Sequence, residues 1–148
     1  MSYQEKKNIV SLISTLLIFS LYSMYVFHMY QEGKFHTTDV FSFWGTFIVI
    51  LIAVSIAVKI IIYIIFNIIY RITTNEKEPA FSDELDKLIK LKATTISHYV
   101  FVGGFFLAMG SLVMDVSPYV MFIILILSGV ISEIVGLITE IYLYRRGF

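Results

Sequence analysis

The chain of 148 residues contains no cysteine, only two prolines and few charged residues. Without cysteine it can form no disulfide, no thiolate metal site and no cysteine nucleophile. Charged residues make up 15% of the sequence, where about 25% is usual in a soluble domain. The 11 basic and 11 acidic residues cancel, so the chain has no overall field that would attract nucleic acid directly.

The apolar residues, by contrast, make up 58% of the chain and gather in four long runs. A helix that crosses a bilayer needs about 20 predominantly apolar residues. The runs therefore predict an all-α polytopic membrane protein, with four transmembrane helices forming a bundle in a single domain over residues 1–148. We expect the spans at residues 9–30, 40–70, 96–114 and 118–144. The second run is long enough that it must tilt or project from the bilayer.

The basic residues predict that both termini are cytoplasmic. If the termini and the loop after the second span lie on one side, that side collects Lys6, Lys7, Arg71, Lys77, Lys87, Lys90, Lys92, Arg145 and Arg146. The other side has Lys34 alone, and Lys59 lies within the second span. Because basic loops stay inside, we expect a multi-pass protein of the cell (cytoplasmic) membrane. The first run is too long for the apolar part of a cleavable signal, so we expect it to be retained.

The polar loop after the second span is predicted to contain an amphipathic cytoplasmic helix over residues 82–95. Ser82 is placed to cap its N-terminus, and acidic residues precede lysines, as the helix dipole favours. Leu85, Leu88 and Ile89 form a narrow apolar stripe. Two interpretations stay open, a solvated linker and a docking surface for a cytoplasmic protein. The candidate docking residues are Asp83, Glu84, Asp86, Lys87 and Lys90.

Charged residues inside a span are the best pointers to function. Lys59 precedes Arg71 by twelve residues, and Glu133 precedes Arg145 by twelve, so both lie roughly 18 Å from these basic anchors. An unpaired charge near the bilayer centre costs at least about 2.5–3.5 kcal/mol. We therefore predict an intramembrane pair between Lys59 and Glu133, direct or through Tyr63 or water.

Two hypotheses for this pair stay open. It holds the bundle in register, or it forms part of a proton or solute path. The polar residues that would line such a path are Ser55, Tyr63, Asn67 and Glu140. The histidines lack a second ligand at metal-site spacing, so no metal site is expected.

The loop and the C-terminal residues resemble those of a known family. Residues 83–89 read Asp-Glu-Leu-Asp-Lys-Leu-Ile, and residues 144–147 read Tyr-Arg-Arg-Gly. Both are similar to motifs of an uncharacterised family of small four-span prokaryotic membrane proteins, known only as a domain of unknown function. The resemblance covers mainly residues 83–148. It implies a bacterial or archaeal membrane and no particular activity.

Three functions from different classes follow from these observations. We favour a non-enzymatic membrane module, such as a regulator, an immunity factor or a subunit, which binds a cytoplasmic protein through residues 76–95. The alternative is a small proton-coupled carrier or channel, working as a homodimer and using Lys59 and Glu133. An intramembrane enzyme is not expected because no catalytic motif and no cofactor motif occurs. The lipid bilayer is the one partner common to all three.

The predicted topology can be tested by cysteine labelling, because the chain has no cysteine of its own. Single cysteines at Ser2 and Asn75 should be protected from an impermeant thiol reagent in intact cells, because the basic side faces the cytoplasm. A cysteine at Thr37 should be labelled in the same cells. Labelling at Asn75 before the cells are opened would contradict the topology.

Overall fold

The structure is a computed structural model that describes residues 3–31, 40–75 and 84–146. These ranges form four helices and contain no strand: α1 (Tyr3–Gln31), α2 (Val40–Thr74), α3 (Glu84–Val113) and α4 (Pro118–Arg146). Each helix is long and apolar enough to cross a membrane. The prediction of an all-α protein with four transmembrane helices is therefore confirmed.

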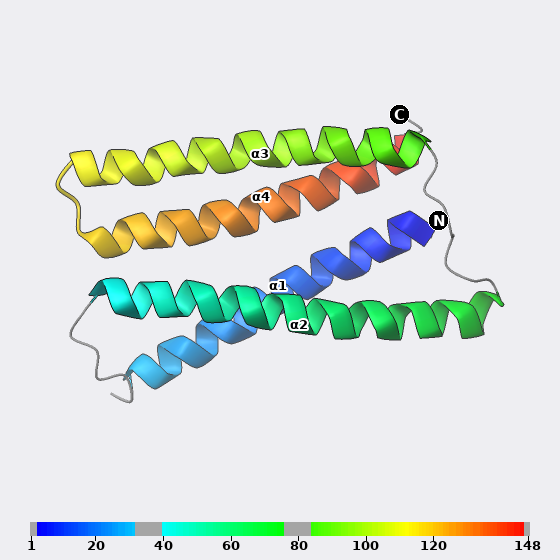
Figure 1. The fold of residues 1–148 in the computed structure, drawn as a ribbon, viewed down its shortest axis with the longest axis horizontal. Helices are drawn as coiled ribbons and strands as arrows, with labels where there is room; N and C mark the ends of the chain where they lie inside the picture. The colour runs from blue at the N-terminus through cyan, green and yellow to red at the C-terminus, as the bar shows by residue number, and fades with distance from the viewer. Residues whose placement is uncertain (1–2, 32–39, 76–83, 147–148) are drawn as a thin grey trace.

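The helices run alternately up and down, so that α1 begins and α4 ends at the same end of the molecule (Figure 1). We call this the terminal end, and the end where α3 connects to α4 the far end. α3 and α4 lie side by side along their length, whereas α1 crosses α2 obliquely. The terminal end thus also includes the end of α2 and the start of α3. Its cytoplasmic orientation stays a prediction.

The loop helix expected over residues 82–95 and the span expected over 96–114 form one uninterrupted helix, α3, in the described part of the chain. Its 30 residues measure about 45 Å, whereas the hydrocarbon core is about 30 Å thick. The charged residues of α3 all lie between Glu84 and Lys92. We therefore expect the first turns of α3 to project from the bilayer at the terminal end. Ser82 and Asp83 lie outside the described residues.

The connection between α3 and α4 is a compact turn of four residues. Asp115 has a φ of 58°, the left-handed conformation that a short polar side chain tolerates. The Val116 amide donates to the Ser111 carbonyl at 3.2 Å, and the Asp115 amide donates to the Leu112 carbonyl at 3.2 Å. This pattern closes the end of α3 as a Schellman motif, so α4 returns directly beside α3.

Small side chains allow α3 and α4 to pack closely. The residues at their contact are Ala93, Ser97, Gly104 and Ala108 of α3 and Ser128, Ser132 and Gly136 of α4. A Cβ atom added at Gly136 would lie 3.3 Å from Ser97 Cβ. The Ser97 hydroxyl also donates to the Ser132 carbonyl at 2.8 Å. In lipid, where the hydrophobic effect does not drive helices together, such close packing and interhelical hydrogen bonds hold them.

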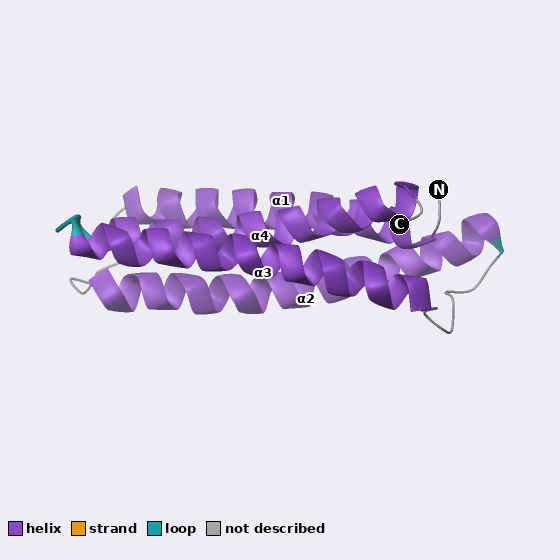
Figure 2. Cartoon of the chain, turned by 90° about the horizontal axis from the view of Figure 1, so that it is seen from above, coloured by secondary structure: helices purple, strands orange, loops and turns teal. Residues whose placement is uncertain are grey.

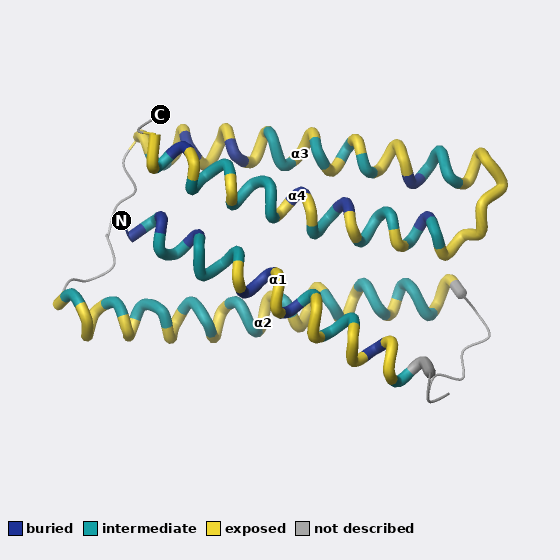
Figure 3. The backbone as a smooth tube through the Cα atoms, turned by 180° about the vertical axis from the view of Figure 1, so that it is seen from behind, coloured by how far each residue is buried: buried dark blue, intermediate teal, exposed yellow. Residues whose placement is uncertain are grey.

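α2 is the least enclosed of the four helices. None of its described side chains is buried, whereas each of the other helices has buried residues (Figure 3). Within the described ranges α2 contacts α1 and α4 but not α3. Seen from above, the first half of α2 lies at one edge of the bundle (Figure 2). Its position therefore depends on a few contacts with α1 and α4.

The close approach of α3 and α4 can be tested at two adjacent glycines. A Cβ at Gly104 would overlap the Ser128 side chain, whereas a Cβ at Gly103 would meet nothing within 4 Å. Gly104→Ala should therefore lower the free energy of unfolding by about 1–3 kcal/mol through overpacking. Gly103→Ala, the matched control, should be neutral or slightly stabilising. Unfolding in mixed micelles measures both, and equal effects would refute the packing.

Candidate functional site

α1 carries a buried polar face along its first half. Its buried polar residues are Glu5, Asn8, Ser14 and Thr15. The Ser14 hydroxyl donates to the Val10 carbonyl at 2.7 Å, which satisfies it within its own helix. Because a polar group in lipid must find an internal partner, this face determines how α1 is turned in the bundle.

Two contacts set the register of α1 against α4. Asn8 Nδ2 donates to Glu140 Oε2 at 2.9 Å. Seven residues further along α1, Thr15 Oγ1 lies 3.3 Å from Glu133 Oε1 and 2.9 Å from the Ser11 carbonyl oxygen. The Thr15 hydroxyl has a single proton, which it can donate to either of these two acceptors. Glu133 and Glu140 are also seven residues apart, so the antiparallel helices match turn for turn.

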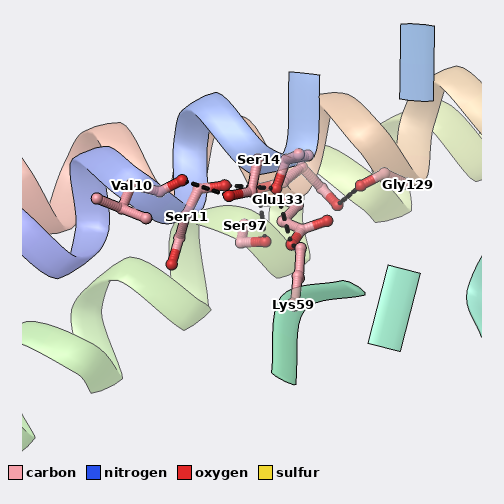
Figure 4. Close-up of polar contacts among 9 residues, drawn as sticks. Val10, Ser11, Ser14, Lys59, Ser97, Gly129 and Glu133 are labelled. Carbon is pink, nitrogen blue, oxygen red and sulfur yellow. Dashed lines mark hydrogen bonds and ion pairs between the residues drawn. The ribbon is translucent and has the colours of Figure 1, made fainter. Parts of the chain in front are cut away.

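Lys59 of α2 forms a direct ion pair with Glu133 of α4, as Figure 4 shows. Glu133 lies near the middle of α4, and the Lys59 side chain reaches it from α2. The side chains remain 30% and 44% exposed, respectively, because α2 and α3 do not meet over them. The pair joins α2 to α4, and through Thr15 it also involves α1.

A second group of contacts joins α1 to α2 at the terminal end. The Tyr3 hydroxyl donates to Asn67 Oδ1, and the Tyr3 ring packs edge-on against Tyr70. The Lys7 ammonium group lies over the Tyr63 ring, 4.6 Å from its centroid. This cation–π contact keeps a lysine beside the bundle near the membrane surface.

A small cavity with both polar and apolar lining residues lies between these contacts and the ion pair. It has a volume of about 20 Å³ and is lined by residues of α1 and α2, among them Lys7, Ser11, Ser14, Lys59 and Tyr63. A cavity of this size holds about one water molecule when polar partners surround it. Polar groups thus extend from the terminal end to Lys59.

The far half of the bundle has a different character. Trp44 of α2 packs edge-on against Phe47 at 5.7 Å and lies parallel to Phe122 of α4 at 6.1 Å. The Tyr22 hydroxyl donates to the Phe47 carbonyl at 3.3 Å. Beyond the ion pair, aromatic and aliphatic side chains therefore replace the polar groups between α1, α2 and α4.

The structure brings together most of the residues predicted from the sequence to lie at this site. Lys59 meets Glu133 directly, without Tyr63 between them. Tyr63, Asn67 and Glu140 each contact α1. Ser55 lies on the same face of α2 as Lys59, but no hydrogen bond joins its side chain to another described residue. The sequence analysis missed Asn8 as the partner of Glu140, although an amide near the start of a span was a visible signal.

The candidate docking residues separate into two groups. Glu84, Lys87 and Lys90 are exposed, whereas Asp86 accepts a hydrogen bond from the Tyr144 hydroxyl at 2.8 Å. The expected apolar stripe also divides, because Ile89 is fully buried while Leu85 and Leu88 are exposed. The helix is turned so that Asp86 and Ile89 are directed to the bundle. Asp83 lies outside the described residues.

The fold and the intramembrane ion pair define this chain as a multi-pass α-helical membrane protein with a polar terminal half and an apolar far half. Comparison with protein-family models, curated proteins and solved structures finds no match. The resemblance to the uncharacterised prokaryotic family therefore stays a prediction. Among the described residues, no three His, Asp or Glu side chains gather as a metal site would require.

A double-mutant cycle tests the ion pair. Lys59→Met leaves Glu133 without its cation, and Glu133→Gln leaves Lys59 without its anion. Each change should cost about 3 kcal/mol of unfolding free energy, because an uncompensated charge remains near the bilayer centre. The double mutant should lose less than the sum of the two single changes, about 3–5 kcal/mol in place of about 6 kcal/mol. Unfolding in mixed micelles should give a coupling term of about 1–3 kcal/mol.

Glu140→Gln is the matched control for this cycle, because Glu140 lies on the same helix but meets the neutral Asn8. It is two turns, or about 10 Å, from Glu133. Its effect should add to that of Lys59→Met, because distant sites are independent. If the effects of Lys59→Met and Glu133→Gln on the unfolding free energy are equally additive, the ion pair contributes no coupling energy.

Proposed function

We propose that this protein is a non-enzymatic membrane module that binds a cytoplasmic protein through the first turns of α3. The observation that supports this proposal is the exposed apolar face on the projecting part of that helix. Leu85, Leu88 and Leu91 are 40%, 49% and 65% exposed. All three lie in the charged segment that extends beyond the hydrocarbon core, where lipid chains do not cover them.

The base of this surface is rigid, which favours specific recognition. On the opposite side of the same turns, Ile89 and Ala93 are almost completely buried. Asp86 is held by Tyr144 of α4. A leucine face that is presented on an anchored helix loses little conformational entropy when a partner binds, so more of the contact energy becomes affinity.

The charges around the leucines indicate the chemistry of the partner. The described terminal turns of α3 and α4 carry Lys87, Lys90, Lys92, Arg145 and Arg146 against Glu84 and Asp86, five basic groups and two acidic ones. The complementary surface is an apolar groove with an acidic rim, as in proteins that bind one face of an amphipathic helix. A regulator, an immunity factor or a subunit would each use such a contact.

Among the described residues, the polar side chains that could line a transport path lie mainly in the terminal half of the bundle. Polar side chains lead from the terminal end past the small cavity to Lys59 and Glu133. Beyond the pair, the space between α1, α2 and α4 is lined by aromatic and aliphatic residues. A proton or polar solute would have to cross this apolar half, so transport requires a second conformation. The binding module requires no such change.

Photocrosslinking tests the docking surface. A photoreactive amino acid placed at Leu88 or Leu91 should form an adduct with one discrete protein in the native cells, because both side chains are accessible outside the hydrocarbon core. Leu107, which is 70% exposed on the same helix, is the matched control. It lies within the span and should react with lipid only.

Charge reversal completes the test. Lys87→Glu with Lys90→Glu should weaken the protein adduct by roughly tenfold, because two favourable contacts become repulsive. The bundle should remain assembled, since both lysines are exposed. Lipid adducts alone at Leu88, Leu91 and Leu107 would contradict the proposal and would indicate that this face lies on the membrane surface.

A further inference from the structure

A large apolar cavity, partly open to the surroundings, lies between α1, α2 and α4 in the far half of the bundle. Its volume is about 630 Å³, within the range of ligand pockets. The lining residues are Phe19, Ser23, Val26, Phe27, Phe43, Trp44, Phe47, Tyr119, Ile123, Ile126 and Leu127. None of them is charged. The cavity is separate from both the ion pair and the docking surface.

The position of the cavity matches one leaflet of the bilayer. Along α1 it extends from Phe19 to Phe27, and along α4 from Tyr119 to Leu127, a length of about 12 Å in each case. Half of a hydrocarbon core about 30 Å thick measures about 15 Å. Trp44 and Tyr119 lie at the rim nearest the far end, where the aromatic belts of membrane proteins meet the headgroups.

The lining excludes water as the natural occupant. An ordered water needs two to four polar partners, and the wall offers few side-chain polar groups. One of these, the Ser23 hydroxyl, has no hydrogen-bond partner among the described residues. The solvent at this depth consists of acyl chains. At about 30 Å³ per water-sized group, the space holds roughly 20 such groups, and a methylene group is of similar size.

We propose that this cavity binds an acyl chain of a membrane lipid, with the lipid headgroup at the rim formed by Trp44 and Tyr119. The chain runs inward between α1 and α4 towards the ion pair. It thereby fills the space that α2 leaves beside α4 and supports the least enclosed helix. This site does not depend on the proposed protein partner, and either can fail alone.

Trp44 makes the site observable, because it is the only tryptophan of the chain and lines the cavity. The protein is reconstituted in phosphatidylcholine vesicles with increasing fractions of a phosphatidylcholine brominated in the upper part of one acyl chain. Bromine quenches tryptophan fluorescence on contact. A bound chain predicts strong, saturating quenching of Trp44, with little quenching by aqueous acrylamide.

Ser23→Phe places a ring in the cavity without breaking a described hydrogen bond, and should reduce the lipid quenching by roughly half. Ser20→Phe is the matched control, because Ser20 lies one turn away on the exposed side of α1, and its quenching should equal that of the wild type. A second matched set on α4 is Ile123→Phe, in the cavity wall, and Ile131→Phe, outside it.

Lower quenching in both wall variants and unchanged quenching in both controls supports the site. Equal quenching in all five proteins would overturn it, because Trp44 would then contact only the surrounding lipid. Strong quenching by acrylamide would overturn it as well, since the cavity would then contain water. If one wall variant fails to fold, the other set decides.

Discussion

The bilayer offers no hydrogen bonds, and this constraint organises the whole molecule. The described backbone satisfies its polar groups within four helices, and the polar side chains must find partners inside the bundle. α1 meets this requirement most clearly, because Asn8 and Thr15 are buried against the carboxylates of α4. The two matched contacts define a register that α1 would lose if it turned or slid along α4. The polar residues thus decide where α1 sits.

The two kinds of helix contact in this protein differ in character. α3 and α4 approach through glycine, alanine and serine, and their closeness follows from the lack of large side chains between them. α2 is held instead by particular contacts, which are the Lys59–Glu133 pair and the ring and hydroxyl contacts with α1. A helix held at a few points can move more easily than one packed along its length. Any conformational change of the bundle is therefore expected to involve α2.

The division of the bundle into a polar and an apolar half connects the functional hypotheses. The polar half contains the small cavity, the ion pair and the anchored start of α3, whereas the apolar half contains the large cavity. A partner bound at Leu88 and Leu91 would contact the helix whose other face packs on α4, the helix that bears Glu133. The proposed docking surface and Glu133 therefore lie on one closely packed element, the α3–α4 hairpin.

Much of this architecture follows from the sequence alone, because apolar run length and the cost of buried charge are local properties. The four spans, the projecting start of α3 and the common depth of Lys59 and Glu133 could all be counted along the chain. Helical periodicity could not say which faces meet, because that depends on how four helices share one interior. The match of Asn8 with Glu140, the burial of Ile89 beside the exposed Leu88, and the hydrogen bond of Asp86 to Tyr144 were decided only by packing. The apolar cavity also belongs to the tertiary structure, since its wall is assembled from residues of α1, α2 and α4 that lie far apart in the sequence.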